Sequence, residues 1–99
     1  MRLEDFTSKV RDRVGQDSGL DVTVKFVLAQ GGVIHVDTKS RPHVVTNDDR
    51  AAQCTVALNA QTLTELIDGS THPSAAYTAG DLVITGDTSV SLKLGRLLS

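Results

Sequence analysis

The feature that most constrains the fold is an alternation of apolar with polar or smaller residues in two neighbouring stretches, residues 22–28 and residues 33–39. The pair Gly31-Gly32 lies between them. A period of two places successive side chains on opposite faces of a β-strand, and a short glycine-containing loop joins antiparallel neighbours. The sequence therefore predicts a β-hairpin, and a one-residue error in register would invert its faces. The residues expected on its inner face are Val24, Phe26, Ile34 and Val36.

Further elements flank this hairpin on both sides. Apolar residues at spacings of three and four predict an amphipathic helix from Leu3 to Val14, which Gly15 ends. Residues 43–46 predict a third, short strand at a sheet edge, because Pro42 adjoins it. Residues 53–58 alternate again and predict a fourth strand.

Two short helices are predicted after the fourth strand. Asn59 is a good N-cap for a helix over the following residues, which Gly69 ends. Pro73 suits the first turn of the next helix, which ends at Gly80. Residues 82–85 then alternate and predict the last strand.

The tail of the chain fits two structures. Val90, Leu92 and Leu94 alternate as in a strand, but the length of the segment and the cap residue Asp87 favour a helix. With this choice the strands are bunched in sequence between helices. That order predicts an α+β fold in one domain over residues 1–99, with an antiparallel-rich sheet and helices on one face.

Composition narrows the choice of partners and location. Only 39% of the residues are apolar, and three are aromatic, so the core is built mostly of Val, Leu, Ile and Ala. A net charge of −2 argues against nucleic acid or an anionic membrane as a standing partner. No apolar run is long enough for a membrane span, and residues 1–15 are too charged for a signal peptide. The end at Ser99 is not a peroxisomal tail, so we expect a cytoplasmic protein.

No motif in the sequence predicts catalysis, a metal site or a cofactor. Cys54 and the three histidines, His35, His43 and His72, supply reactive side chains, but they have neither a nucleophile elbow nor metal-ligand spacing. Cys54 lies on an apolar strand face, where a free thiol packs as a small hydrophobe, and His35 alternates toward the other face. Residues 47–49 lack the spacing of a calcium loop. We therefore expect a protein that is not an enzyme.

Five stretches carry a resemblance to a known family. They are Gln53–Leu58, Leu63–Gly69, His72–Tyr77, Gly80–Asp87 and Leu92–Leu94. In this order and with these gaps the chain resembles the sterol carrier protein 2 domain family, from the glycine hairpin to the last helix. The resemblance implies a five-stranded, largely antiparallel sheet covered on one face by helices, with an apolar tunnel between them. It also implies a ligand such as a fatty acid, fatty acyl-CoA, sterol or phospholipid, and no catalytic residue.

The leading hypothesis is a stand-alone, bacterial-type member of this family that binds or transfers lipid and holds one acyl-type chain. The missing peroxisomal tail makes sterol a doubtful natural ligand. Ala79 stands next to the position where some relatives carry a polar glutamine in the cavity, so their head-group recognition is not carried over. The predicted lipid-binding residues are Val24, Phe26, Ile34, Val36, Val56, Leu63, Ile67, Ala76, Tyr77, Ala79, Ile84, Val90, Leu94 and Leu98.

Two other interpretations stay open at this point. Leu92 and Leu97 would leave an apolar strip on the last helix, which favours a ligand-free interaction or dimerisation module. A thiol enzyme acting through Cys54 is the third. The expected partners are thus a lipid or fatty acyl ligand and no nucleic acid, with transient membrane contact and a homodimer both compatible with the sequence.

Overall fold

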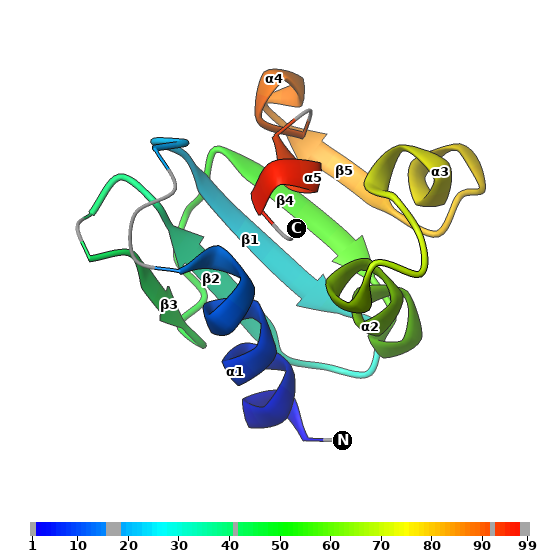
Figure 1. The fold of residues 1–99 in the computed structure, drawn as a ribbon, viewed down its shortest axis with the longest axis horizontal. Coiled ribbons are helices and arrows are strands. Elements are labelled where there is room, and N and C mark those ends of the chain that lie inside the picture. The colour runs from blue at the N-terminus through cyan, green and yellow to red at the C-terminus, as the bar shows by residue number, and fades with distance from the viewer. Residues whose placement is uncertain (1, 16–18, 41, 92, 98–99) are drawn as a thin grey trace.

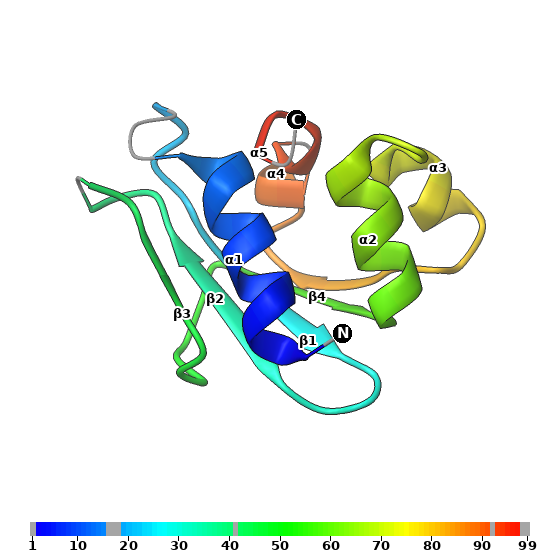
Figure 2. The same ribbon diagram turned by 60° about the horizontal axis from the view of Figure 1, so that its bottom comes forward.

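A five-stranded sheet and a layer of helices make up the protein (Figure 1). The computed structural model describes residues 2–15, 19–40, 42–91 and 93–97. The helices lie on one face of the sheet, as the second view shows (Figure 2), so the predicted α+β architecture is confirmed. The strands are β1 Thr23–Leu28, β2 Val33–Asp37, β3 Val44–Thr46, β4 Cys54–Leu58 and β5 Val83–Gly86. The helices are α1 Leu3–Val14, α2 Ala60–Asp68, α3 Pro73–Thr78, α4 Thr88–Ser91 and α5 Leu94–Leu97.

The strand order is β3-β2-β1-β4-β5, and the predicted hairpin is at its centre. β1 and β2 are antiparallel, with Phe26 opposite Ile34, and the amide of Leu28 donates to the carbonyl of Gly32 at 3.0 Å. β1 and β4 run parallel, with Phe26 opposite Val56, while the other pairs are antiparallel. The sheet is therefore largely antiparallel, with one parallel pair in the middle.

Local signals place the first two helices. α1 buries Phe6, Val10 and Val14 against the sheet, as its spacing predicts. The side chain of Asn59 accepts a hydrogen bond from the amide of Thr62 at 2.7 Å, which is the predicted N-cap of α2. Because an N-cap oxygen satisfies an amide that the helix leaves unpaired, this contact fixes where α2 begins.

The C-terminal segment differs from the single helix that the tail predicts. Asp87 caps its start, since its carboxylate accepts from the amide of Ser89 at 2.9 Å. The helix then breaks, because the amide of Lys93 bonds to the carbonyl of Val90 and closes a tight turn. α5 restarts after this turn and buries Leu97, whose side chain is 1% exposed. The expected apolar strip therefore loses Leu97 to the core, and Leu92 lies outside the described residues.

Within the described ranges, no helix has the length and apolar character needed to cross a membrane.

Candidate functional site

The candidate site is the apolar layer between the sheet and the helices. Its floor is the inner face of the three central strands. The side chains predicted there are each at most 1% exposed, so the predicted register is confirmed: Val24, Phe26, Ile34, Val36 and Val56. The floor contains a single aromatic ring, that of Phe26, and is otherwise branched aliphatic.

The roof comes from helix α1 near the start of the chain and from the helices α2 to α5 in its second half. Of the predicted residues, the structure buries Leu63 and Ile67 of α2, Ala76 of α3, Val90 of α4 and Leu94 of α5. α5 lies above β1 and β4, between α1 and α2, in both views (Figures 1 and 2). The chain's last described helix thus occupies the middle of the layer where the predicted ligand would lie.

The buried core also contains residues that the predicted lipid-binding set lacks, among them two of α1 and one of α5. Phe6 and Val10 of α1 are 4% and 0% exposed, and Leu97 of α5 is 1% exposed. The helical spacing of α1 predicts correctly that Phe6 and Val10 face the core, but it was interpreted as ordinary core packing. Leu97 follows Val90 by seven residues and Leu94 by three, which is a helical spacing, but the predicted site included Leu98 in its place.

Three predicted site residues are less enclosed than expected, and a fourth lies outside the described residues. Tyr77 is 58% exposed and Ala79 is also exposed, which differs from the prediction that they line a cavity. The reason is the shortness of α3: it buries one residue, Ala76, and the next side chain points about 100° around the helix, away from the sheet. Ile84 is half-buried and packs against the core, and Leu98 lies outside the described residues.

Cys54 is buried in the sheet and is 0% exposed. Burial raises the pKa of its thiol, and the negative charge of Asp87 raises it further. The protonated thiol is therefore the form present at neutral pH, whereas the thiolate is the nucleophile. This environment is that of a packing residue.

The histidines are used in local hydrogen bonds. His43 Nδ1 lies 2.8 Å from the carbonyl oxygen of Ser40, and His35 Nε2 lies 3.1 Å from that of Ala51. In the described part of the chain, no three His, Cys, Asp or Glu side chains are grouped so that they could hold a metal ion. These contacts serve to fix loops.

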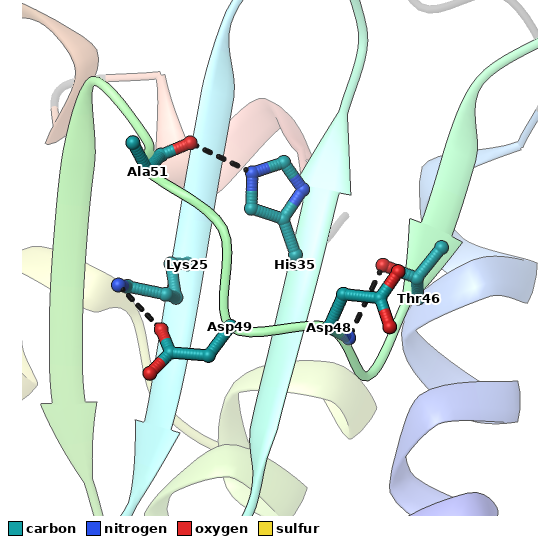
Figure 3. A network of polar contacts seen from close by, with 6 residues as sticks. All are labelled: Lys25, His35, Thr46, Asp48, Asp49 and Ala51. Carbon is teal, nitrogen blue, oxygen red and sulfur yellow. Dashed lines mark hydrogen bonds and ion pairs between the residues drawn. The ribbon is translucent and has the colours of Figure 1, made fainter.

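The face of the sheet opposite the helices is crossed by residues 47–53, which connect β3 to β4 (Figure 3). Lys25 Nζ holds Asp49 Oδ1 at 2.8 Å, and the ring of His35 holds the carbonyl of Ala51. This cover leaves His35 only 4% exposed, although the alternation predicts correctly that it points away from the helices. The covered part of this face is polar, so the apolar layer under the helices is the only candidate site that the described residues form for an acyl ligand.

The protein is a small α+β domain. Its one apolar layer lies between one face of a mixed sheet and the helices that cover this face. The model of the SCP-2 sterol transfer family matches residues 6–99, and this chain belongs to that family. The predicted family resemblance is therefore confirmed.

Individual relatives agree with this assignment. Sterol carrier protein 2 of Oryctolagus cuniculus is 35% identical over 63 residues, which are 63% of this chain and 12% of that protein, so the matched region is a small part of that relative. The structure of palmitated SCP2L2 from Aedes aegypti has a TM-score of 0.70 at 18% identity, over 99% of this chain and 95% of that chain. The inverting sec-alkylsulfatase Pisa1 from Pseudomonas sp. has a TM-score of 0.75 at 20% identity, over 100% of this chain and 16% of that chain. At these identities the two structures establish the fold.

Proposed function

We propose that this domain is a non-catalytic lipid-binding and lipid-transfer module that holds one acyl chain, as a fatty acid, a fatty acyl-CoA or a similar ligand, in a tunnel between the sheet and the helices. The observation that carries the proposal is membership of the SCP-2 sterol transfer family over residues 6–99. The palmitated SCP2L2 structure, which shares the fold over nearly the whole chain, favours an acyl ligand. The proposed function needs no nucleophile and no proton donor.

The position of α5 supports the proposal physically. Leu94 and Leu97 are each 1% exposed and lie in the middle of the apolar layer. A domain of this size does not tolerate a large empty tunnel, since a void of roughly 300 Å³ would cost about 7 kcal/mol, close to the whole stability of a typical domain. We propose that the two leucines fill the layer when no ligand is bound.

For a ligand to enter, its acyl chain must then take the place of the Leu94 and Leu97 side chains. Burying a sixteen-carbon chain is worth about 12 kcal/mol before association costs, and the two leucines contribute about 3–6 kcal/mol in the same terms. The acyl chain therefore offers more burial than the leucines it displaces. α4 and α5 are the segment proposed to move, because each spans a single turn and the chain enters them through Gly86, at a φ of 96°.

The proposed contacts with the acyl chain follow from the buried set. They are Val24, Phe26, Ile34, Val36, Val56, Leu63, Ile67 and Ala76, with Ile84 at the margin. The buried residues Val90, Leu94 and Leu97 belong to the segment that is proposed to move when the ligand enters. Tyr77 and Ala79 are left out because their side chains are exposed.

Competitive binding tests the proposal. A fluorescent fatty acid is bound to the purified domain and displaced in parallel by palmitate, palmitoyl-CoA and cholesterol, while native mass spectrometry of untreated protein detects lipid that co-purifies. We expect displacement by the two acyl ligands at lower concentration than by cholesterol. A bare chain in the mass spectrum, together with no binding of the fluorescent acid, would refute lipid binding.

A surface variant makes this test specific for the proposed walls. Tyr77→Ala changes an exposed side chain and should leave the affinity for the fluorescent acid unchanged. Leu63→Trp overfills a fully buried position of the roof and should weaken binding. If Tyr77→Ala weakens binding as much as Leu63→Trp does, the acyl chain lies against the exposed side of α3 and the proposed walls are wrong.

Location and assembly remain predictions. The cytoplasm is the predicted compartment, and transfer implies transient contact with donor and acceptor membranes. A homodimer is tested by light scattering with and without palmitate.

A further inference from the structure

The two edges of the sheet differ in how their backbone groups are protected. β3, at one edge, has three residues, and Arg11 Nη2 of α1 donates to the carbonyl of Val45 at 2.8 Å. A short strand with a charged side chain on its backbone is a poor template for another strand. β5, at the other edge, pairs with β4 alone, and among the described residues no side chain donates a hydrogen bond to its backbone (Figure 1 shows its place in the sheet).

The outward groups of β5 can be assigned from its register. The amide of Asp87 donates to the carbonyl of Gln53 at 2.7 Å, and Thr85 is paired with Thr55 in the same antiparallel ladder. Because backbone groups alternate in direction along a strand, the amides of Ile84 and Gly86 point away from β4. Within the described ranges no hydrogen bond is made by either amide.

The side chains beside this edge continue an apolar row. On the face opposite the helices, Val33, Val27, Ala57 and Val83 lie next to one another across β2, β1, β4 and β5. Val83 ends the row at the edge and is 59% exposed. A further strand beside β5 would place one side chain next to Val83, and an apolar residue there would extend the row.

Two carboxylates bracket the edge. Asp81 precedes β5 and Asp87 follows it, and both are exposed. Asp87 also accepts from Ser89 and lies in the field of Lys93, which reduces but does not cancel the negative charge at that end. An incoming strand with basic residues at both ends complements this pattern, whereas an acidic one is repelled.

The same charges disfavour a second copy of the chain as the occupant. An antiparallel pairing of two β5 strands centred on Ile84 would put Asp81 opposite Asp87 at both ends. A pairing centred on Thr85 would put Asp87 opposite the apolar Val83. Like charges placed directly opposite each other destabilise a pair of strands, so self-pairing is unfavourable in one register and mismatched in the other.

We propose that β5 is a docking edge for an extended segment of a partner protein, in which alternate residues are apolar and Lys or Arg residues lie at both ends. Such strand addition derives its affinity from main-chain hydrogen bonds and its specificity from the side chains that alternate along the strand. The site is separate from the apolar layer under the helices and does not depend on lipid binding.

Amide hydrogen exchange measured by NMR tests the proposal with a defined probe. The probe is a synthetic peptide in which threonine and valine alternate between two pairs of lysines. In the free protein, the amides of Ile84 and Gly86 should exchange faster than the amide of Thr85, which faces β4. With the peptide present, Ile84 and Gly86 should become protected while the amides of β3 are unchanged. No protection of these two amides at saturating peptide would overturn the proposal.

Charge variants separate this docking from other causes of protection. The double variant Asp81→Asn with Asp87→Asn removes both charges but keeps a side chain at residue 87 that can cap α4. It should weaken peptide binding roughly fivefold at low salt. The matched control, Glu4→Gln with Asp12→Asn, removes two exposed charges from α1 and should leave binding unchanged. Equal weakening by both pairs, or the same two amides becoming protected by raised protein concentration alone, would refute a basic partner segment.

Discussion

Replacing Leu97 by alanine tests whether α5 occupies the place of the ligand. The side chain is 1% exposed, so its truncation removes a fully buried isobutyl group. Large-to-small changes of this kind cost about 2–5 kcal/mol. At about 4–8 °C per kcal/mol for a domain of this size, the melting temperature of the ligand-free variant should fall by at least about 8 °C.

Affinity for an acyl chain should move in the opposite direction. In the parent chain, an acyl chain that displaces Leu97 must expose this buried side chain, which costs about 2 kcal/mol. In Leu97→Ala this cost is absent. Fatty acid binding should therefore tighten, by at most about thirtyfold. The increase in melting temperature on adding palmitate should be larger for Leu97→Ala than for the parent chain.

Leu63→Ala is the control for this experiment. Leu63 of α2 is 0% exposed and contributes to the proposed roof from a helix that stays in place. Its truncation should lower the melting temperature by a similar amount but weaken the binding of the fluorescent fatty acid, because the roof loses contacts with the ligand. If Leu97→Ala weakens binding by the same factor as Leu63→Ala, Leu97 is ordinary core and the exchange between α5 and ligand is refuted.

Three further outcomes are expected. Gly86→Ala should destabilise the fold far more than Gly80→Ala in thermal unfolding, because both glycines have positive φ but a Cβ at Gly86 would lie 2.5 Å from the carbonyl of Gln53; equal losses would contradict this. Cys54 should react with a thiol probe at neutral pH only after denaturation, since burial raises its pKa. For Asp37, burial raises the pKa, but hydrogen bonds from the residues that follow outweigh it and hold the folded-state pKa below the unfolded value. Its ionised form therefore stabilises the fold above about pH 4, and the contribution is lost as pH falls through the folded-state pKa; Asp37→Asn should flatten that part of the pH dependence of unfolding.

The parts of the fold that were predicted correctly depend on short-range signals. Alternation fixes which side chains of β1, β2 and β4 face the helices, because a strand offers only two faces. Asn59 marks the start of α2 through a side-chain contact three residues away. Pro42 places β3 at an edge for an equally local reason, the missing amide of proline.

The parts that were missed depend on packing between distant segments. Nothing near Tyr77 indicates that α3 turns it outward, because that depends on how α3 sits over the sheet. The chain turns at Lys93 between α4 and α5, and Leu94 and Leu97 are buried after this turn, which the local helix signals do not indicate. The burial of the predicted residues on β1, β2 and β4 agrees with their alternation, whereas the exposure of Tyr77 and Ala79 could not be predicted from local signals.

The crossover between β3 and β4 explains why the candidate apolar layer forms on only one face of the sheet. β3 is an edge strand, whereas β4 lies beyond β1, so the chain must pass over β2 and β1 to reach it. With the helices on one face, the crossing takes the other, where Lys25 and His35 hold residues 47–53 (Figure 3). The polar positions of the alternating strands thus bind the crossover, and the apolar positions are left to the layer under the helices. One alternating pattern in the sequence thereby serves both topology and the proposed ligand, because Lys25 and His35 hold the connection on one face while Val24, Phe26, Ile34 and Val36 lie under the helices on the other.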